Sequence, residues 1–148
     1  ISETLKDFKA LIPRYNEVKE NPRLFQLFMS RNRNPLWDLS GNKMFKTGLK
    51  SDEVLKVLSG GVEDHFIQRT KGMKIIFHKL NENPNMSVEE FTRLIISYSS
   101  TITLTKEEHN KVTSYAKVND MLNYQVYNVL GIEVEGLSDF LIRQNILF

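Results

Sequence analysis

The apolar residues of this chain recur mainly at intervals of three and four, the spacing that places side chains on one face of an α-helix. In residues 2–20, Leu5, Phe8 and Tyr15 share such a face, which predicts an amphipathic helix in which Pro13 introduces a kink or a new turn. The same spacing predicts further helices at residues 24–28, 36–45, 49–58, 62–81, 87–98, 105–122, 124–130 and 136–148.

Helix-start signals support several of these predicted helices. Ser87 is followed by Glu90, and Thr105 is followed by Glu108, so both pairs have the spacing of a capping box. Ser51 precedes two acidic residues, which place negative charge at the exposed amides of a first helical turn. These signals fix where three of the helices should begin.

Breaks between the predicted helices are rich in glycine, proline and asparagine. Residues 31–35 form a polar connector ending in Pro35, Gly48 closes the helix at 36–45, and residues 59–61 read Ser-Gly-Gly. No segment alternates like a half-buried strand, and the one candidate, residues 101–104, is too short to build a sheet. The pattern therefore predicts an all-α fold with roughly seven to nine helices.

Two segments of the first half of the chain are echoed in the second half. Residues 7–15 (DFKALIPRY) and 90–98 (EFTRLIISY) share Phe, Leu, Ile and Tyr at the same spacing. Residues 53–58 (EVLKVL) and 125–130 (QVYNVL) share two Val and a Leu. Because the pairs occur in the same order, we interpret them as an internal repeat. The boundary would fall near Pro84, giving a first helical module at residues 1–83 and a second, shortened module at 84–148.

Composition excludes several classes of protein. Hydrophobic residues make up 41% and charged residues 26% of the 148 residues, as in an ordinary globular protein. The net charge of +2 is too small to indicate a nucleic-acid partner. Without cysteine there is no disulfide framework, thiolate nucleophile or zinc site built on sulfur. Since the chain begins at Ile1, we expect an N-terminal segment to have been removed.

The sequence offers little catalytic chemistry. The three histidines, His65, His78 and His109, lack a convincing set of ligand residues at helical metal-site spacing, so they are predicted to be surface residues. The carboxylates divide between first helical turns, where they complement the helix dipole, and single surface sites. We therefore expect no catalytic residue, no metal site and no cofactor, and we predict that the protein is not an enzyme.

A cluster of basic residues is the candidate binding site. It consists of Arg31, Arg33, Lys43, Lys46, Lys50 and Lys56, which lie between two apolar stripes. One interpretation is a solvated face with no further role. The other is a binding surface for an acidic protein partner or an anionic membrane.

Residues 45–58 (FKTGLKSDEVLKVL) resemble the W motif of the WY-domain effectors that oomycete plant pathogens secrete. Phe45 stands where that family usually has Trp, and a helix with the pattern Val-x-x-x-Leu follows it, with Leu58 closing the pattern. Residues 73–81 are similar to the Y motif, with Met73 and Ile76 in place of its aromatics. The echoes at residues 90–98 and 126–132 are similar to the L and W motifs of tandem-repeat members.

The resemblance implies an RXLR-type effector with stacked helical modules, one full and one shortened WY-like unit. Such a protein would be secreted by the pathogen, enter the host cell, bind a host protein and suppress immunity. The small net charge predicts no nucleic-acid partner, and membrane-surface association and homodimer formation stay open. The alternative is an unrelated all-helical interaction or regulatory domain without enzymatic activity, for example a viral or phage adaptor.

Overall fold

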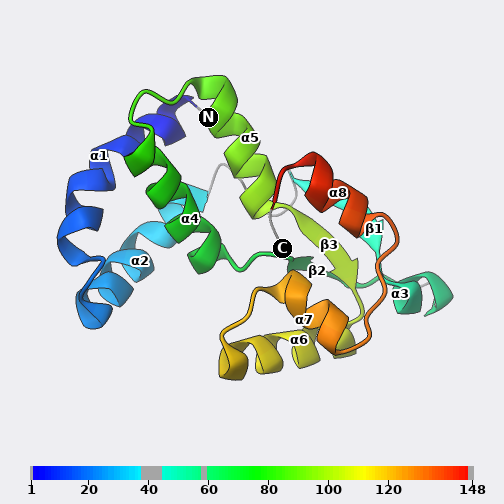
Figure 1. Cartoon of the computed structure of the whole chain (residues 1–148). Helices are drawn as coiled ribbons and strands as arrows, with labels where there is room; N and C mark the ends of the chain where they lie inside the picture. The colour runs from blue at the N-terminus through cyan, green and yellow to red at the C-terminus, as the bar shows by residue number, and fades with distance from the viewer. Residues whose placement is uncertain (1, 38–44, 58–59, 147–148) are drawn as a thin grey trace. The chain divides into compact units, whose positions relative to one another are not determined.

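A computed structural model describes residues 2–37, 45–57 and 60–146, without the side chains of residues 33–37. The chain forms two compact units that interleave along the sequence (Figure 1). Unit 1 comprises residues 1–41 and 69–98, and unit 2 comprises residues 42–68 and 99–148. This division differs from the predicted modules 1–83 and 84–148, because strands from both halves of the chain pair with each other in unit 2.

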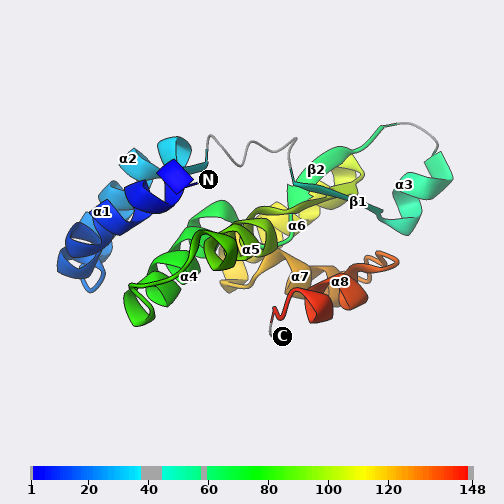
Figure 2. The same ribbon diagram turned by 90° about the horizontal axis from the view of Figure 1, so that it is seen from above.

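Unit 1 is built from four helices. They are α1 (Ser2–Val18), α2 (Pro22–Trp37), α4 (Arg69–Glu82) and α5 (Val88–Ser99). Helices α1 and α2 lie side by side in both Figure 1 and Figure 2, and both pack on α4. The segment 31–35, predicted to be a connector, lies within α2, so that prediction is wrong. The apolar positions of α2 continue past residue 28 with Met29, which is buried.

An aromatic cluster forms the centre of unit 1. Phe77 on α4 stacks on Tyr15 with ring centroids 4.9 Å apart, and it contacts Phe8 at 4.9 Å and Phe28 at 5.6 Å. Phe8 also meets Phe91 of α5 edge-on at 5.5 Å. These rings are almost fully buried, so all four helices contribute to one core. The amphipathic spacing predicted from the sequence is confirmed at these positions.

Unit 2 contains a three-stranded sheet that the sequence analysis missed. Strands β1 (Lys46–Lys50), β3 (Thr101–Leu104) and β2 (Val62–His65) lie in the order β1-β3-β2. Strand β3 pairs in parallel with β1 and antiparallel with β2. The surrounding helices are α3 (Asp52–Val57), α6 (Lys106–Asn119), α7 (Asn123–Val129) and α8 (Leu137–Arg143).

Three sequence predictions fail at this sheet. Residues 101–104 form its central strand, and their Thr-Ile-Thr-Leu sequence suits a buried strand because β-branched residues pack well on a pleated surface. The helix predicted from residue 62 begins only at Arg69, because residues 62–65 pair with β3. Gly48 does not close a helix; it lies in β1 at φ +80°, where an L side chain would be strained.

The close approach of the chain to β3 explains why residue 61 is a glycine. A Cβ atom at this position would lie 2.2 Å from the carbonyl oxygen of Leu104, so a larger residue cannot fit without moving the backbone. The Ser-Gly-Gly break predicted at residues 59–61 thus contains a glycine with a packing requirement. Residues 58 and 59 and most of the helix predicted at 36–45 lie outside the described residues.

The predominantly helical fold is confirmed, with eight helices in the described parts of the chain. Residues 7–15 and 90–98 are helical, as are residues 53–57 and 125–129 of the other echoed pair, but each pair falls within a single unit. Helices α1 and α5 belong to unit 1, whereas α3 and α7 belong to unit 2. The echo therefore does not produce two equivalent modules. Within the described residues, no helix is long and apolar enough to span a membrane.

Candidate functional site

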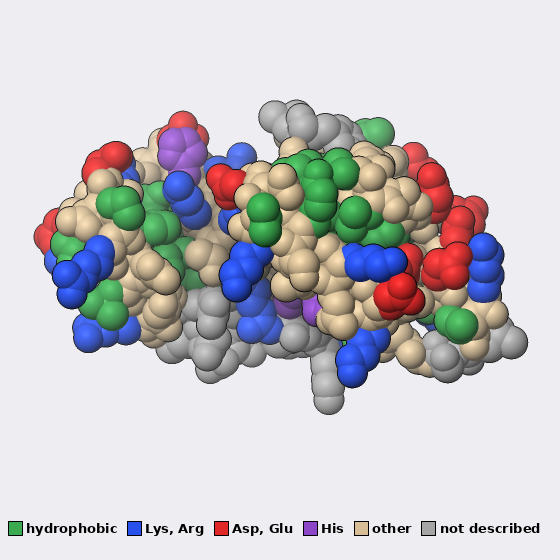
Figure 3. All heavy atoms as spheres, turned by 90° about the horizontal axis from the view of Figure 1, so that it is seen from below, with side chains coloured by type: hydrophobic (Ala, Val, Ile, Leu, Met, Phe, Trp, Pro, Cys, Tyr) green, Lys and Arg blue, Asp and Glu red, His purple; other side chains and the backbone are tan. Residues whose placement is uncertain are grey.

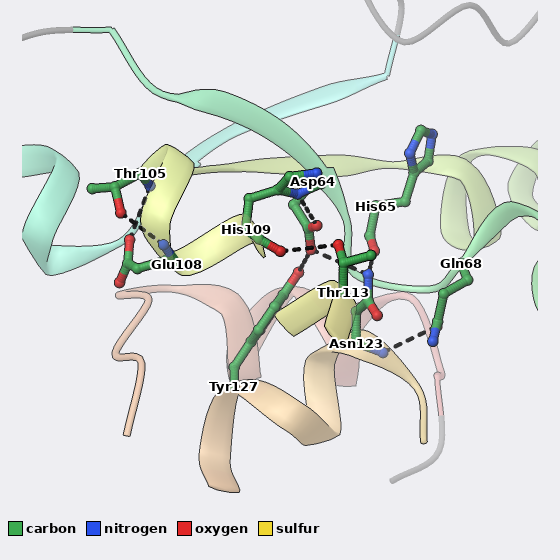
Figure 4. Close-up of polar contacts among 9 residues, drawn as sticks. All are labelled: Asp64, His65, Gln68, Thr105, Glu108, His109, Thr113, Asn123 and Tyr127. Carbon is green, nitrogen blue, oxygen red and sulfur yellow. Dashed lines mark hydrogen bonds and ion pairs between the residues drawn. The ribbon is translucent and has the colours of Figure 1, made fainter. Parts of the chain in front are cut away.

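A buried carboxylate, Asp64, is the centre of a polar cluster in unit 2. Its side chain is only 1% exposed and projects from β2 toward α6 and α7 (Figure 4). Successive residues of a strand point to opposite faces, so Glu63 on the neighbouring position faces the other way. There the Glu63 carboxylate accepts hydrogen bonds from the hydroxyls of Thr101, at 2.8 Å, and Thr103, at 2.5 Å.

Three side chains from two helices converge on Asp64. Nδ1 of His109 on α6 lies 2.7 Å from Oδ1 of Asp64. Oδ2 accepts a hydrogen bond from the hydroxyl of Tyr127 and one, at 3.3 Å, from the amide nitrogen of Asn123, both on α7. The same Asn123 nitrogen donates to the carbonyl oxygen of His65 at 2.8 Å. The cluster therefore ties β2 to α6 and α7 through one carboxylate.

A neighbouring set of hydrogen bonds fixes the start of α6 and joins it to α3. The predicted capping box is confirmed, with the Glu108 amide donating to Thr105 Oγ1 at 3.1 Å and the Thr105 amide donating to Glu108 Oε1 at 3.0 Å. The buried Ser51 hydroxyl donates to the same Glu108 oxygen at 2.6 Å and accepts the Val54 amide at the start of α3. In unit 1, the reciprocal bonds of Ser87 and Glu90 confirm the other predicted box.

Burial raises the pKa of Asp64 above its ordinary value of 3.8, and the hydrogen bonds from Tyr127, His109 and Asn123 oppose that shift. The pKa of Tyr127 is raised well above 10.0, because the ring is buried and a tyrosinate would face the Asp64 carboxylate. The hydroxyl thus remains protonated and able to donate.

This shift predicts a pH dependence of stability. A carboxyl whose pKa is higher in the folded than in the unfolded state binds an extra proton on folding, so its contribution to stability falls as pH rises from 3.8 through the raised pKa. Over this pH range, the wild type should lose stability relative to an Asp64→Asn variant. Urea unfolding of both proteins at several pH values in the range measures the difference in their free energies of unfolding. A difference that is constant with pH would contradict the raised pKa.

The cluster is better suited to holding the unit together than to catalysis. Asp64 is sealed from solvent and receives three donors, whereas a catalytic carboxylate must reach its substrate. His109 has 36% of its side chain exposed, and Asp64 fixes its Nδ1. The described residues contain no group of three His, Cys, Asp or Glu side chains that could hold a metal ion.

The sequence pattern did not predict this cluster. It predicted surface positions for His65, His78 and His109 and a helix across residues 62–81. His78 does lie at the surface, with Nε2 3.3 Å from Oε1 of Glu82. The side chain of His109 is partly exposed, but one of its ring nitrogens is held by a buried aspartate, which the sequence did not predict. The His-Asp pair spans 45 positions, so only the strand pairing could have revealed it.

The predicted basic site is divided between the two units. Arg31 lies on α2 in unit 1, and Lys46 and Lys50 lie on β1 in unit 2. Lys56 lies on α3 and pairs with Glu53 at 3.2 Å. The side chain of Arg33 and all of Lys43 lie outside the described residues.

Two of the predicted lysines border a groove in unit 2. Lys46 and Lys50 are exposed and line a hollow of about 420 Å³ together with residues of α3, Gly60, Gly61, Glu63 and Thr103. Among the described residues, neither lysine is engaged in an ion pair or a side-chain hydrogen bond, while Glu63 is already held by two threonines. The groove therefore offers two unpaired positive charges beside a carboxylate whose oxygens accept hydrogen bonds from two threonines.

Comparisons with known proteins give no further guidance: no protein-family model, curated protein or solved structure matches this chain.

Proposed function

We propose that this protein acts by binding an acidic protein partner through the face of unit 2 that carries Lys46 and Lys50. The observation that carries the proposal is the pair of exposed, unengaged lysines along one groove. Two exposed positive charges on one strand complement an acidic partner surface and attract it. Such binding should weaken as salt concentration rises.

The resemblance to WY-domain effectors makes a plant protein the proposed partner. On this proposal the chain is a virulence effector that a plant pathogen secretes into host cells, where it binds a host protein and suppresses immunity. The motif spacings at residues 45–58, 73–81, 90–98 and 126–132 support it. The proposed activity needs no cofactor and no catalytic residue.

Reversing both charges tests the proposed surface. A Lys46→Glu/Lys50→Glu variant should fold as the wild type does, because both side chains are exposed, and should capture far less of its partner from plant extract. Pull-down followed by mass spectrometry measures the capture. A Lys106→Glu/Lys117→Glu variant makes the same change in net charge on α6 and should bind normally. If both variants capture equal amounts of the partner, the groove is not the binding surface.

A further inference from the structure

A second groove, apolar in character, belongs to unit 1, whereas the lysine-bordered groove belongs to unit 2. Leu24 and Leu27 on α2 are 39% and 48% exposed, although large apolar side chains favour burial. They form the shared wall of two hollows of about 670 Å³ and about 160 Å³. Leu11 of α1 and the buried ring of Phe28 line the smaller hollow, which therefore lies between α1 and α2, whereas the larger hollow lies along residues 21–30 at the start of α2.

The rim of this groove is basic. Arg23 borders the larger hollow, and Arg14 and Arg31 border the smaller one, whereas no acidic residue is among the described residues that line either. Arg14 is paired with Glu17 at 2.8 Å. Within the described part of the chain, Arg23 and Arg31 form no ion pair or side-chain hydrogen bond. Figure 3 shows hydrophobic and basic side chains side by side in the α1–α2 region, on the left.

We propose that this groove is a docking site for an amphipathic helix of a partner protein, with an apolar stripe flanked by Asp or Glu. Leucines at the centre would receive the apolar stripe, and the guanidinium groups of Arg23 and Arg31 would pair with the flanking carboxylates. Arginine suits this role because its planar fork binds a carboxylate through two hydrogen bonds. The proposal does not depend on the lysine-bordered groove, which belongs to the other unit.

Charge and shape favour a partner helix in this groove over two other occupants, a second copy of the chain and a membrane. A second copy of the chain bound across a twofold axis would bring the same arginines to the interface, where they would repel. A membrane binds apolar side chains on a convex face, whereas the half-exposed Leu24 and Leu27 border a hollow between α1 and α2 that an inserted side chain can fill. A helix inserted into the groove can contact both leucines and the basic rim together.

Selection from a displayed library of helical peptides tests the proposal on the full chain. Enriched peptides should carry apolar residues at i, i+3, i+4 and i+7 with flanking acids. A Leu24→Ser/Leu27→Ser variant, changed only at exposed positions, should bind them roughly tenfold or more weakly in fluorescence anisotropy. Arg31→Glu should also weaken binding and reduce its dependence on salt.

Matched controls lie on α5 of the same unit. Val88→Ser removes an apolar side chain that is 45% exposed, and Arg93→Glu reverses an exposed charge; both should leave peptide binding unchanged. No enrichment, enrichment of basic peptides, or equal binding by the leucine variant would overturn the proposal. Loss of phosphatidylserine-vesicle binding, or of self-association, in the leucine variant would assign the groove to a membrane or a second copy and overturn it as well.

Discussion

Replacing Asp64 by alanine is expected to destabilise unit 2 by roughly 3–5 kcal/mol, the cost of breaking a buried polar pair from one side. The substitution leaves the buried hydroxyl of Tyr127 and the amide of Asn123 without the carboxylate that accepts their hydrogen bonds. It also frees the His109 ring from β2. Hydrogen-exchange mass spectrometry should show faster exchange in β3 and α6, and chemical denaturation should show the lost stability.

The matched control is Asp64→Asn, which keeps the shape and one acceptor oxygen. It should cost about 1–2 kcal/mol, since only part of the hydrogen bonding is lost. Tyr127→Phe removes a single donor and should fall in the same range. If alanine and asparagine at position 64 have equal effects, the carboxylate does not organise the cluster as described.

Replacing Phe77 by alanine is expected to destabilise unit 1 by about 3–5 kcal/mol. The ring is fully buried and contacts Phe8, Tyr15 and Phe28, so its removal leaves a cavity that no single neighbour can fill. Hydrogen exchange should become faster in α1 and α4, which would show that the loss of stability lies in unit 1. Thermal unfolding measures the size of that loss.

Phe77→Leu provides the control, because it removes less volume and should cost less than the alanine variant. The two units also provide controls for each other. The Phe77 variant should speed hydrogen exchange more in α4 than in α6. The Asp64 variant should speed it more in α6 than in α4. Identical exchange patterns in both variants would contradict the division into two compact cores.

The sequence predicted those parts of the fold that depend on local signals. Both capping boxes are present, because the Ser or Thr and the Glu that form them lie three residues apart on the same helix end. The amphipathic stripe with Phe8 and Tyr15 is buried as expected. These features need no knowledge of distant residues.

The sheet depends on distant residues, and no local pattern revealed it. Strand β3 has four residues and pairs with β1 and β2, whose residues lie 36 or more positions earlier in the chain. Residues 62–65 have no apolar alternation, because their buried member is Asp64. From sequence alone, an aspartate is expected at the surface, and only the fold shows the partners that allow it to be buried.

The candidate binding residues were only partly predictable for a similar reason. Basic residues close together in the sequence were expected to form one patch, yet Arg31 belongs to unit 1 and Lys46 to unit 2. Leu24 and Leu27 were predicted as part of an apolar stripe, and their exposure beside Arg23 became visible only when α1 and α2 were packed together.

Carbodiimide cross-linking of the wild-type protein to the plant protein it captures tests the proposed function most directly, since this reagent joins lysine to Asp or Glu at zero length. We expect Lys46 and Lys50 to carry the dominant cross-links to acidic residues of the partner, and added salt to suppress these cross-links. Cross-links concentrated on α6 lysines such as Lys106 and Lys117, with none on β1, would contradict it.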